Sequence, residues 1–259
     1  MLDNELDLTP IRIERSGKVA LISYNRPARR NAWSVTCVRE TIAAIKLANA
    51  DPEVGAIVLT AEGTTFCAGA DLKEAAEYDP VTKRRLTPAS FTMGAGDANW
   101  INLLIQSKPV IVAINGPAVG IGATHPLAAD IRLAAKSASF SFPFLRLGAM
   151  SECGSTALLP RLIGAGRAMD ILLRNATVSA DEALQIGLVS AVLPDAQLRE
   201  AAIALGEQIA ALPPLQVKLT KRMLADNAVS ADADSIMRVE TEAFVELLRA
   251  LKTEKPLQG

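Results

Sequence analysis

The feature that most constrains the fold is a pair of short, almost wholly apolar runs at residues 55–61 (GAIVLTA) and 109–114 (PVIVAI). Runs of this length without polar alternation are typical of strands covered on both faces, as in parallel sheets. Ahead of the first run, apolar residues recur near the helical period over 34–49, with Ser34 as the expected N-cap and Asp51 at the expected end. Helices that alternate with buried strands predict strand–helix–strand crossovers, and therefore an α/β fold.

The remaining segments divide the chain into two predicted parts. A hairpin is expected near the start, where two β-rich runs at 11–15 and 18–24 are separated by a Ser-Gly pair. Further along, the pattern predicts helix 122–129, strand 131–135, helices near 153–173 and 180–186, and a last apolar run at 188–193. The chain then lacks strand alternation, so we expect a core over 1–194 and a region of two or three helices over 195–259.

Charge and hydropathy exclude two classes of partner. The chain has 27 basic and 28 acidic residues and a formal net charge of -1, which offers no field for a nucleic acid or an acidic membrane. The apolar runs are much shorter than the roughly 20 residues needed to cross a bilayer. The first residues, MLDNELDLTPIRIERSG, are acidic and match neither a secretory signal nor a transit peptide. We therefore expect no nucleic-acid partner and no membrane partner.

Cysteine and histidine usage limits the chemistry. Cys37, Cys67 and Cys153 are odd in number and form no CxxC pair, which favours a reducing, cytoplasmic location over a disulfide framework. His125 is the only histidine, so imidazole-rich metal sites are excluded, and we assign this residue no role. The GxG that begins at Gly120 lacks a third glycine, and GxSxG, GxxxxGK[ST] and HExxH motifs are absent from the sequence. We expect no metal and no redox cofactor.

Two glycine-bearing loops, 63–72 (GTTFCAGADL) and 115–124 (NGPAVGIGAT), each lie between a predicted strand and a predicted helix. Glycine lets the backbone approach a ligand closely, and the first turn of a helix leaves N–H groups without intrahelical partners. Each loop can therefore present one backbone donor to an oxyanion, and losing such a donor costs about 2.7–4 kcal/mol of transition-state stabilisation. The alternative is a pair of tight turns that serve packing alone.

A series of short segments runs in order through residues 11–194. The segments are Asn25-Arg26-Pro27 with Asn31-Ala32, then 66–72 (FCAGADL), 115–120 (NGPAVG), 129–132 (ADIR), Leu147-Gly148, 159–162 (LPRL) and 183–189 (ALQIGLV). As a set they resemble the enoyl-CoA hydratase/isomerase family, also called the crotonase family. The resemblance implies a spiral of repeated ββα units with a C-terminal helical region that forms trimers, commonly paired into hexamers. We therefore expect a homotrimer or homohexamer that binds an acyl-CoA, with coenzyme A as part of the substrate.

The resemblance also implies a coenzyme A site. The main chain of Ala68 and Leu72 matches loop positions that recognise the adenine end of coenzyme A. Arg26 and Ala32 fall in the segment that lines the pantetheine and phosphate side. The other residues expected to line the substrate site are Ala70, Asp71, Gly120 and Phe144.

Departures from the family pattern decide the expected reaction. Hydratases of the family place a water with two glutamates, and here those positions hold Thr124 and Phe144, which cannot act as bases. Glu152 instead matches the acidic residue of the family's double-bond isomerases and ring-opening isomerases. By position, the backbone N–H groups of Ala70 and Ile121 form the oxyanion hole. We expect Glu152 to move the proton while these two donors hold the negative oxygen.

The surroundings of Glu152 bear on whether it is a useful base. We expect an apolar site containing Phe144 and Met150 to raise its pKa from about 4.3 toward about 6–7. The alternative is a helix-start carboxylate bound by the free N–H groups around 154–156. Glu74 is a rival acid near the first loop, ranked below Glu152.

The expected activity is therefore isomerisation of a 3-enoyl-CoA to a 2-enoyl-CoA by a single acid. One alternative is an enoyl-CoA hydratase or another acyl-CoA lyase with an unusual acid, such as Glu74 or a group from 75–100. The other alternative is a non-catalytic relative that binds acyl-CoA. The composition changes over 73–100, and we expect this segment to cover the ligand.

Overall fold

Both predicted apolar runs are buried strands of one mixed sheet in the computed structural model, which describes residues 6–8, 10–71, 99–228 and 232–254. The strands, in sheet order, are β1 (Leu6–Leu8), β2 (Ile11–Ser16), β3 (Val19–Tyr24), β4 (Ala56–Ala61), β5 (Val110–Ile114), β7 (Ile131–Ala135) and β10 (Ala191–Leu193). The predicted hairpin is confirmed, because β2 and β3 pair antiparallel. From β3 to β10 the neighbouring strands run parallel.

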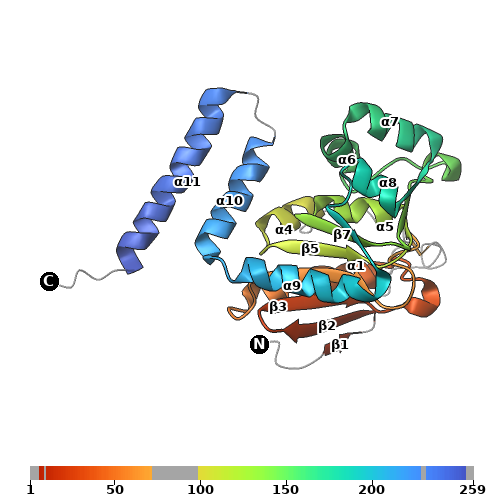
Figure 1. Ribbon diagram of the computed structural model, residues 1–259, viewed down its shortest axis with the longest axis horizontal. Coiled ribbons are helices and arrows are strands. Elements are labelled where there is room, and N and C mark those ends of the chain that lie inside the picture. The colour runs from red at the N-terminus through yellow and green to blue at the C-terminus, as the bar shows by residue number, and fades with distance from the viewer. Residues whose placement is uncertain (1–5, 9, 72–98, 229–231, 255–259) are drawn as a thin grey trace, which may run out of the picture.

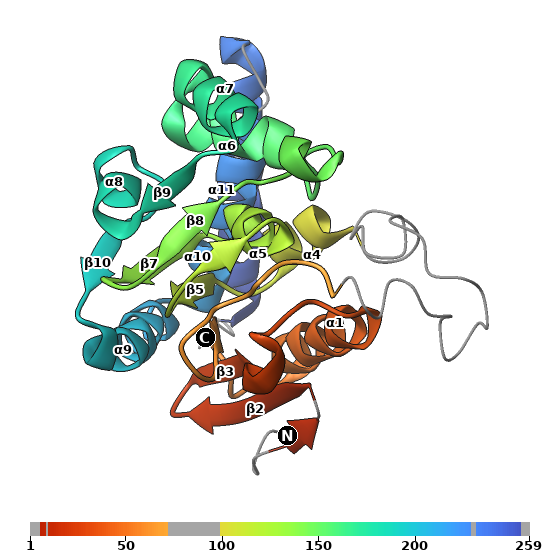
Figure 2. The same cartoon turned by 90° about the vertical axis from the view of Figure 1, so that its right-hand side faces the viewer.

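Helices cover both faces of this sheet, which is why every side chain of β4 and β5 is buried. Figure 2 shows α9 (Leu198–Ala210) on one side and α1 (Val35–Ala50) on the other. The start of α1 is as predicted, since the Ser34 side chain accepts a hydrogen bond from Cys37 N at 3.1 Å. α9 lies so near the sheet that a Cβ on Gly206 would be 2.8 Å from a methyl group of Val19. The predicted α/β class is confirmed.

The chain from residue 99 to α9 also forms a second, small sheet and a series of short helices. Its strands are β6 (Ala118–Val119), β8 (Ser139–Ser141) and β9 (Thr177–Ser179), and the helices are α4 (Trp100–Gln106), α5 (Ile121–Thr124), α6 (Ser155–Ile163), α7 (Ala165–Arg174) and α8 (Ala180–Gln185). The predicted helix 122–129 is wrong in extent. Pro126 lacks an N–H donor, and the α-helix gives way to a 3-10 helix at His125–Ala128.

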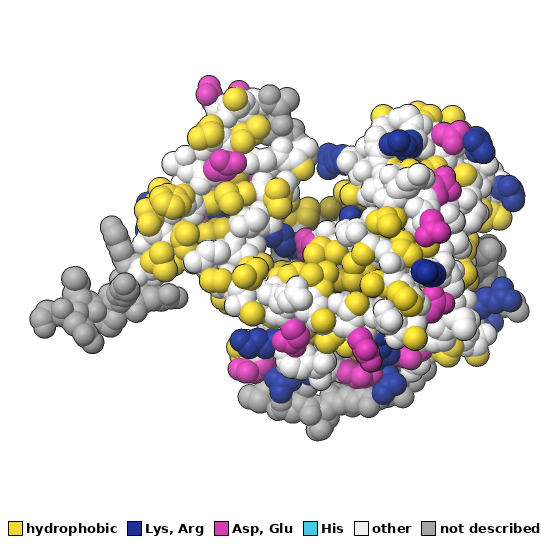
Figure 3. Space-filling model, in the orientation of Figure 1, with side chains coloured by type: hydrophobic (Ala, Val, Ile, Leu, Met, Phe, Trp, Pro, Cys, Tyr) yellow, Lys and Arg dark blue, Asp and Glu magenta, His cyan; other side chains and the backbone are white. Residues whose placement is uncertain are grey.

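The C-terminal part is helical, as predicted, and within the described residues it consists of α9, α10 (Pro214–Asn227) and α11 (Ala233–Glu254). α9 packs on the sheet, whereas α10 and α11 project from the body as an antiparallel pair (Figure 1). Hydrophobic side chains gather on this pair (Figure 3), where Leu224 is 70% exposed and Met237 and Phe244 are each 60% exposed. In the part of the chain that the structure describes, no helix has the length and hydropathy needed to span a membrane.

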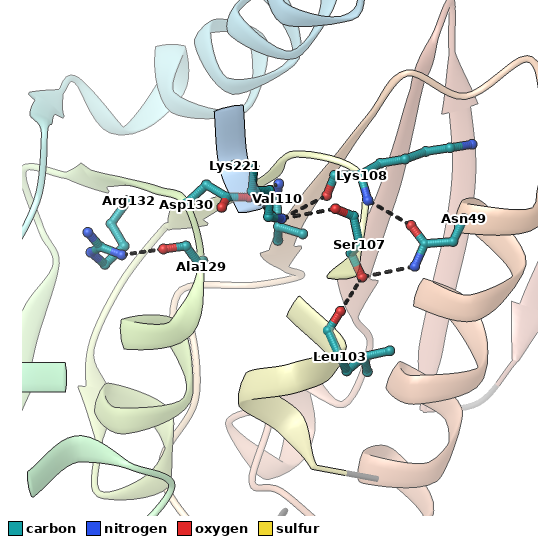
Figure 4. Close-up of polar contacts among 9 residues, drawn as sticks. All are labelled: Asn49, Leu103, Ser107, Lys108, Val110, Ala129, Asp130, Arg132 and Lys221. Atoms are coloured by element: carbon teal, nitrogen blue, oxygen red, sulfur yellow. Dashed lines mark hydrogen bonds and ion pairs between the residues drawn. The ribbon is translucent and has the colours of Figure 1, made fainter. Parts of the chain in front are cut away.

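Lys221, whose side chain is nearly buried, joins α10 to residues at the ends of strands β5 and β7 (Figure 4). Lys221 Nζ donates hydrogen bonds to Asp130 Oδ2 at 2.7 Å and to the carbonyl oxygens of Ser107 at 3.0 Å and Lys108 at 3.3 Å. The same Asp130 oxygen accepts from Val110 N at 2.7 Å. Burial lowers the pKa of Lys221, and the Asp130 carboxylate opposes that shift. These contacts set where the projecting helix pair leaves the core.

Candidate active site

The two glycine-bearing loops lie against each other. Cys67 and Ala118 form an isolated parallel bridge, and Val119 N donates to the Cys67 carbonyl oxygen at 2.9 Å. A Cβ on Gly122 would lie only 2.4 Å from that same carbonyl oxygen, so this close approach requires glycine. The glycines therefore serve packing, and through packing they bring together the two segments expected to carry oxyanion donors.

Each expected donor is oriented by the carbonyl of its own peptide unit. Trp33 N donates to the Gly69 carbonyl at 2.7 Å, and in a trans peptide the N–H of Ala70 points away from that carbonyl. The Gly120 carbonyl accepts two hydrogen bonds inside α5, at 2.9 and 3.1 Å, so the Ile121 N–H points out of the first turn. Neither N–H donates to any residue that the structure describes. Both are available to a negative oxygen.

Glu152 lies between the 3-10 helix Leu145–Leu147 and α6. Its Oε1 accepts a hydrogen bond from Thr124 Oγ1 at 2.9 Å, which joins the carboxylate to the helix that begins at Ile121. Its Oε2 is buried and has no hydrogen-bond partner within the described residues. Burial raises the pKa of Glu152, and the Thr124 hydrogen bond partly opposes the rise. A buried carboxyl with one free oxygen and a raised pKa has the properties of a general base.

The helix-start alternative for Glu152 does not match its contacts. The backbone carbonyl of Glu152, and not its carboxylate, accepts from Ser155 N at 3.1 Å and from Ser155 Oγ at 2.7 Å. Between them, the non-glycine residue Cys153 has a left-handed φ of 57°, a conformation that L side chains rarely adopt. The chain is bent here without using the Glu152 side chain as a cap.

Of the two apolar side chains expected around Glu152, one is buried and the other is exposed. Phe144 is buried, whereas Met150 is 82% exposed, so the prediction for Met150 is wrong. The physical reason is that the 3-10 helix ends at Gly148 and the chain after it runs along the surface. The fully buried Thr124 contacts the carboxylate, and its hydrogen bond acts against the rise in pKa that burial causes.

Arg26 and Asp71, both expected to contact the substrate, bind each other. Arg26 Nη2 lies 2.9 Å from Asp71 Oδ2, and Arg26 Nη1 donates to the Ala32 carbonyl oxygen at 2.7 Å. The two side chains are 18% and 6% exposed, so the pair lies below the surface. Because Asp71 directly follows Ala70, the pair holds the loop that carries the first expected donor.

The other residues expected to bind coenzyme A differ in what they offer. Ala68 N donates to the Arg30 carbonyl oxygen at 3.0 Å, and the Ala68 carbonyl oxygen accepts no backbone hydrogen bond from the described residues. Gly120 has a φ of 56° and a ψ of -121°, and a Cβ there would meet open space. Ala32 is partly exposed. Outside the described residues lie Leu72, Glu74 and the rest of the predicted cover up to residue 98.

His125 is fully buried in an aromatic cage. Its ring centroid lies 3.9 Å from that of Trp33 and 5.5 Å from that of Phe66. Nδ1 donates to the Ile121 carbonyl oxygen at 2.7 Å, so Nε2 accepts from the Tyr24 hydroxyl at 2.8 Å. Burial lowers the pKa of His125 to about 3, which keeps the ring neutral near pH 7. The histidine supports the helix that begins at Ile121.

The sequence reasoning missed the contact of Thr124, which it treated only as the replacement of a carboxylate. The spacing shows that Thr124 lies one helical turn after Ile121. Its partner Glu152 is 28 positions further along the chain, and no local pattern indicates that the two side chains meet.

Comparisons with known proteins place nearly the whole chain in one family. A family model described as enoyl-CoA hydratase/isomerase matches residues 14–259. The chain is 34% identical over 242 residues to the short-chain-enoyl-CoA hydratase of Clostridium acetobutylicum, which covers 93% of this chain and 90% of that protein. It is 35% identical over 220 residues to 4-chlorobenzoyl coenzyme A dehalogenase-2 of an Arthrobacter species, covering 84% and 78%. The crystal structure of an enoyl-CoA hydratase subunit I from Geobacillus kaustophilus matches with a TM-score of 0.82 at 32% identity, over 94% of this chain and 91% of that one.

These matches span nearly the whole chain at identities above the level at which only the fold is shared. The TM-score of 0.82 over most of both chains shows that the overall fold is shared as well. The chain therefore belongs to the enoyl-CoA hydratase/isomerase family, and its fold is the crotonase fold that the sequence predicts.

Proposed function

We propose that this protein is an acyl-CoA isomerase that moves a double bond from the 3 position to the 2 position by proton transfer through Glu152. The observation that carries the proposal is the carboxyl of Glu152: its Oε2 is buried without a partner among the described residues, and its Oε1 is tied by Thr124 to the helix that starts at Ile121. The two hydratase positions hold Thr124 and Phe144, neither of which is an acid. A double-bond shift needs only one acid, because the group that removes the proton can return it.

In the proposed reaction, Glu152 removes a proton from carbon 2 of a 3-enoyl thioester. The electron pair of the broken C–H bond enters a dienolate, whose charge on the thioester oxygen is stabilised by the N–H groups of Ala70 and Ile121. The protonated carboxyl then delivers the proton to carbon 4, and the double bond forms between carbons 2 and 3. Substrate and product are isomers, so the atom balance requires no co-reactant. We accordingly propose no resident metal or redox cofactor.

Coenzyme A recognition follows from the same loops in this proposal. No described residue donates a hydrogen bond to the carbonyl oxygen of Ala68, and in this proposal that oxygen accepts one from the adenine end. The Arg26–Asp71 ion pair holds the Ala70 loop in place for the thioester. Because Arg26 forms this ion pair within the protein, we propose that its main role is to position the loop and not to contact phosphate directly.

The exposed hydrophobic side chains of α10 and α11 favour association with further copies of the chain (Figure 3). We propose a homotrimer or homohexamer assembled partly through this surface. The thiols of Cys37, Cys67 and Cys153 are free, which supports a reducing compartment such as the cytoplasm.

Hydration of a 2-enoyl-CoA is the second candidate function, because the Clostridium relative is named a hydratase. It would require Glu152, Glu74 or a group from 75–100 to hold and activate a water. Binding of acyl-CoA without catalysis is the remaining alternative. Each candidate predicts a different product mass, or no product.

Parallel assays on 3-enoyl-CoA and 2-enoyl-CoA distinguish these functions. Conjugation is followed by ultraviolet absorbance, and products are identified by mass. We expect conversion of the 3-enoyl to the 2-enoyl thioester without a change in mass, and its loss in Glu152→Gln. A product heavier by one water would favour the hydratase, and binding of both thioesters without turnover would favour the non-catalytic role.

A further inference from the structure

We propose that Thr124 is a positioning residue that gives the two oxygens of Glu152 different tasks: Oε1 is held by the protein, and Oε2 exchanges the proton. The inference rests on the proposed function of Glu152 as the general base. It deepens that proposal by naming the reactive oxygen and the residue that selects it.

The hydroxyl of Thr124 has one proton and two acceptors within reach. Glu152 Oε1 lies 2.9 Å from Thr124 Oγ1, and the Ile121 carbonyl oxygen lies 3.4 Å away. The Ile121 carbonyl already accepts a hydrogen bond from His125 Nδ1 at 2.7 Å. The shorter contact to a charged acceptor is the stronger one, so the hydroxyl proton is directed to Oε1.

The position of this hydroxyl is well determined by its surroundings. Thr124 is 0% exposed, and a β-branched side chain in a helix has few χ1 rotamers. The short helix α5 is held from both sides. Gly122 touches the Cys67 carbonyl, and the following residue, His125, lies in the aromatic cage. Thr124 is thus a rigid donor against which the carboxyl is oriented.

The hydrogen bond from Thr124 makes the two carboxyl oxygens inequivalent. Oε1 keeps its donor in both protonation states, because an acid protonated at Oε2 still accepts a hydrogen bond at Oε1. Oε2 is buried and lacks a partner within the described residues, so its lone pairs are free for the substrate proton. The Thr124 contact need not break as the proton moves. One oxygen can therefore remove the proton from carbon 2 and return it to carbon 4 without rotation of the carboxyl group.

Two substitutions at Thr124 separate this role from packing. Thr124→Val removes the hydroxyl and preserves the shape of the side chain, whereas Thr124→Ser keeps the hydroxyl and removes a methyl group. Thermal unfolding of both variants controls for stability. The readouts are turnover of 3-enoyl-CoA and exchange of the carbon-2 protons of butyryl-CoA in deuterated water, followed by NMR. The exchange reaction needs only the base and the oxyanion donors, whatever unsaturated acyl group is the true substrate.

We expect Thr124→Val to lower kcat and the exchange rate about 10- to 100-fold with little change in KM, because a misplaced base loses the geometry of attack. The acid limb of its pH profile should move to higher pH, since the hydrogen bond that favours the carboxylate is gone. Thr124→Ser should keep the wild-type acid limb and rates within about threefold, because its hydroxyl still reaches Oε1.

Three outcomes would overturn the inference. If Thr124→Val keeps the wild-type rates and acid limb while Glu152→Gln is inactive, Thr124 does not position the carboxyl, and Glu152 remains the proposed base. Equal losses in the Val and Ser variants, with unchanged acid limbs, would assign Thr124 to packing. No exchange by the wild type, or exchange that survives Glu152→Gln, would remove Glu152 as the base and the role of Thr124 with it.

Discussion

Two carboxylates of the protein, Asp130 and Glu152, have opposite surroundings. Asp130 has a cation and a backbone donor on one oxygen, with Lys221 Nζ and Val110 N each at 2.7 Å. Glu152 has a single neutral donor, Thr124, and among the described residues no cation contributes to its pKa. A paired and multiply bonded carboxylate stabilises the folded chain, whereas a buried one without a cation is destabilising and keeps lone pairs free for chemistry. The contrast indicates that Asp130 docks α10, and it supports the proposed role of Glu152 in the reaction.

Exchanging each carboxylate for its amide gives the sharpest test of this contrast and the largest expected effect. Glu152→Gln should lower turnover by about 10²–10⁴-fold, because the general base is lost. Thermal stability should be unchanged or higher, since a costly buried charge is removed. Initial rates and calorimetry on the same preparation measure both quantities.

The matched control is Asp130→Asn, which should show the reverse pattern of lower stability with normal turnover per folded molecule. If Asp130→Asn inactivates the folded enzyme, or if Glu152→Gln unfolds it, the division of roles between the two carboxylates fails.

Removing the cation at the structural site should have the next largest effect. Lys221→Met removes the cation from Asp130 and the lysine donor from two carbonyl oxygens, and we expect a loss of about 1–3 kcal/mol in the free energy of unfolding. The loss should be smaller than for a fully buried pair, because the Asp130 side chain is 29% exposed. Urea denaturation measures it, with the exposed Lys218→Met on the same helix as a control expected within about 0.5 kcal/mol of the wild type. Equal effects of the two substitutions would contradict the docking role.

The raised pKa of Glu152 predicts a pH-dependent difference in stability. The folded state binds the Glu152 proton more tightly than the unfolded chain, whose glutamate pKa is about 4.3. This contribution is fully present below that pH and is lost as the pH rises through the folded pKa. The free energy of unfolding of Glu152→Gln should therefore increase relative to that of the wild type as the pH rises above about 4.3. The increase should be about 1.4 kcal/mol for each unit by which folding raises the pKa of Glu152. Urea titrations between about pH 4 and pH 8 follow the difference. A constant difference would mean that burial does not perturb this carboxyl.

The smallest effect is expected at Met150, which lies two residues from Glu152 but on the surface. Met150→Ala should change the free energy of unfolding by less than about 0.5 kcal/mol, because little apolar area is buried there. The acid limb of the pH profile should also stay in place. A clear shift of that limb would return Met150 to the apolar environment of the base.

Local patterns predicted much of the fold, and they failed where a distant contact decides. The boundaries of α1 and β5 follow from a capping serine and from a continuous apolar run, which are properties of neighbouring residues. The early end of α5 depends on Pro126, a local signal that the helical pattern alone did not weigh. Burial at Phe144 and exposure at Met150 are not local properties, because both depend on the path of the loop across the core.

The candidate site divides in the same manner. The residues at positions 124, 144 and 152 are read directly from the sequence, and the family resemblance implied that the first two lack the hydratase glutamates and that Glu152 matches the acid of the isomerases. Resemblance of its motifs supplied the expected donors, Ala70 and Ile121. The resemblance did not show that Arg26 pairs with Asp71 or that Thr124 donates a hydrogen bond to Glu152. Each of these contacts joins segments that only folding brings together.

The sequence by itself determined the α/β class, the family and the inventory of acids, because strand patterns, motifs and residue identities are read along the chain. Only the tertiary structure decided which carboxylate is neutralised and which keeps a free oxygen. Lys221 meets Asp130 across 91 positions, and Thr124 meets Glu152 across 28. The physical reason is that pairing and desolvation depend on distances of a few ångströms in space, and those distances are set by the packing of the whole sheet and its helices.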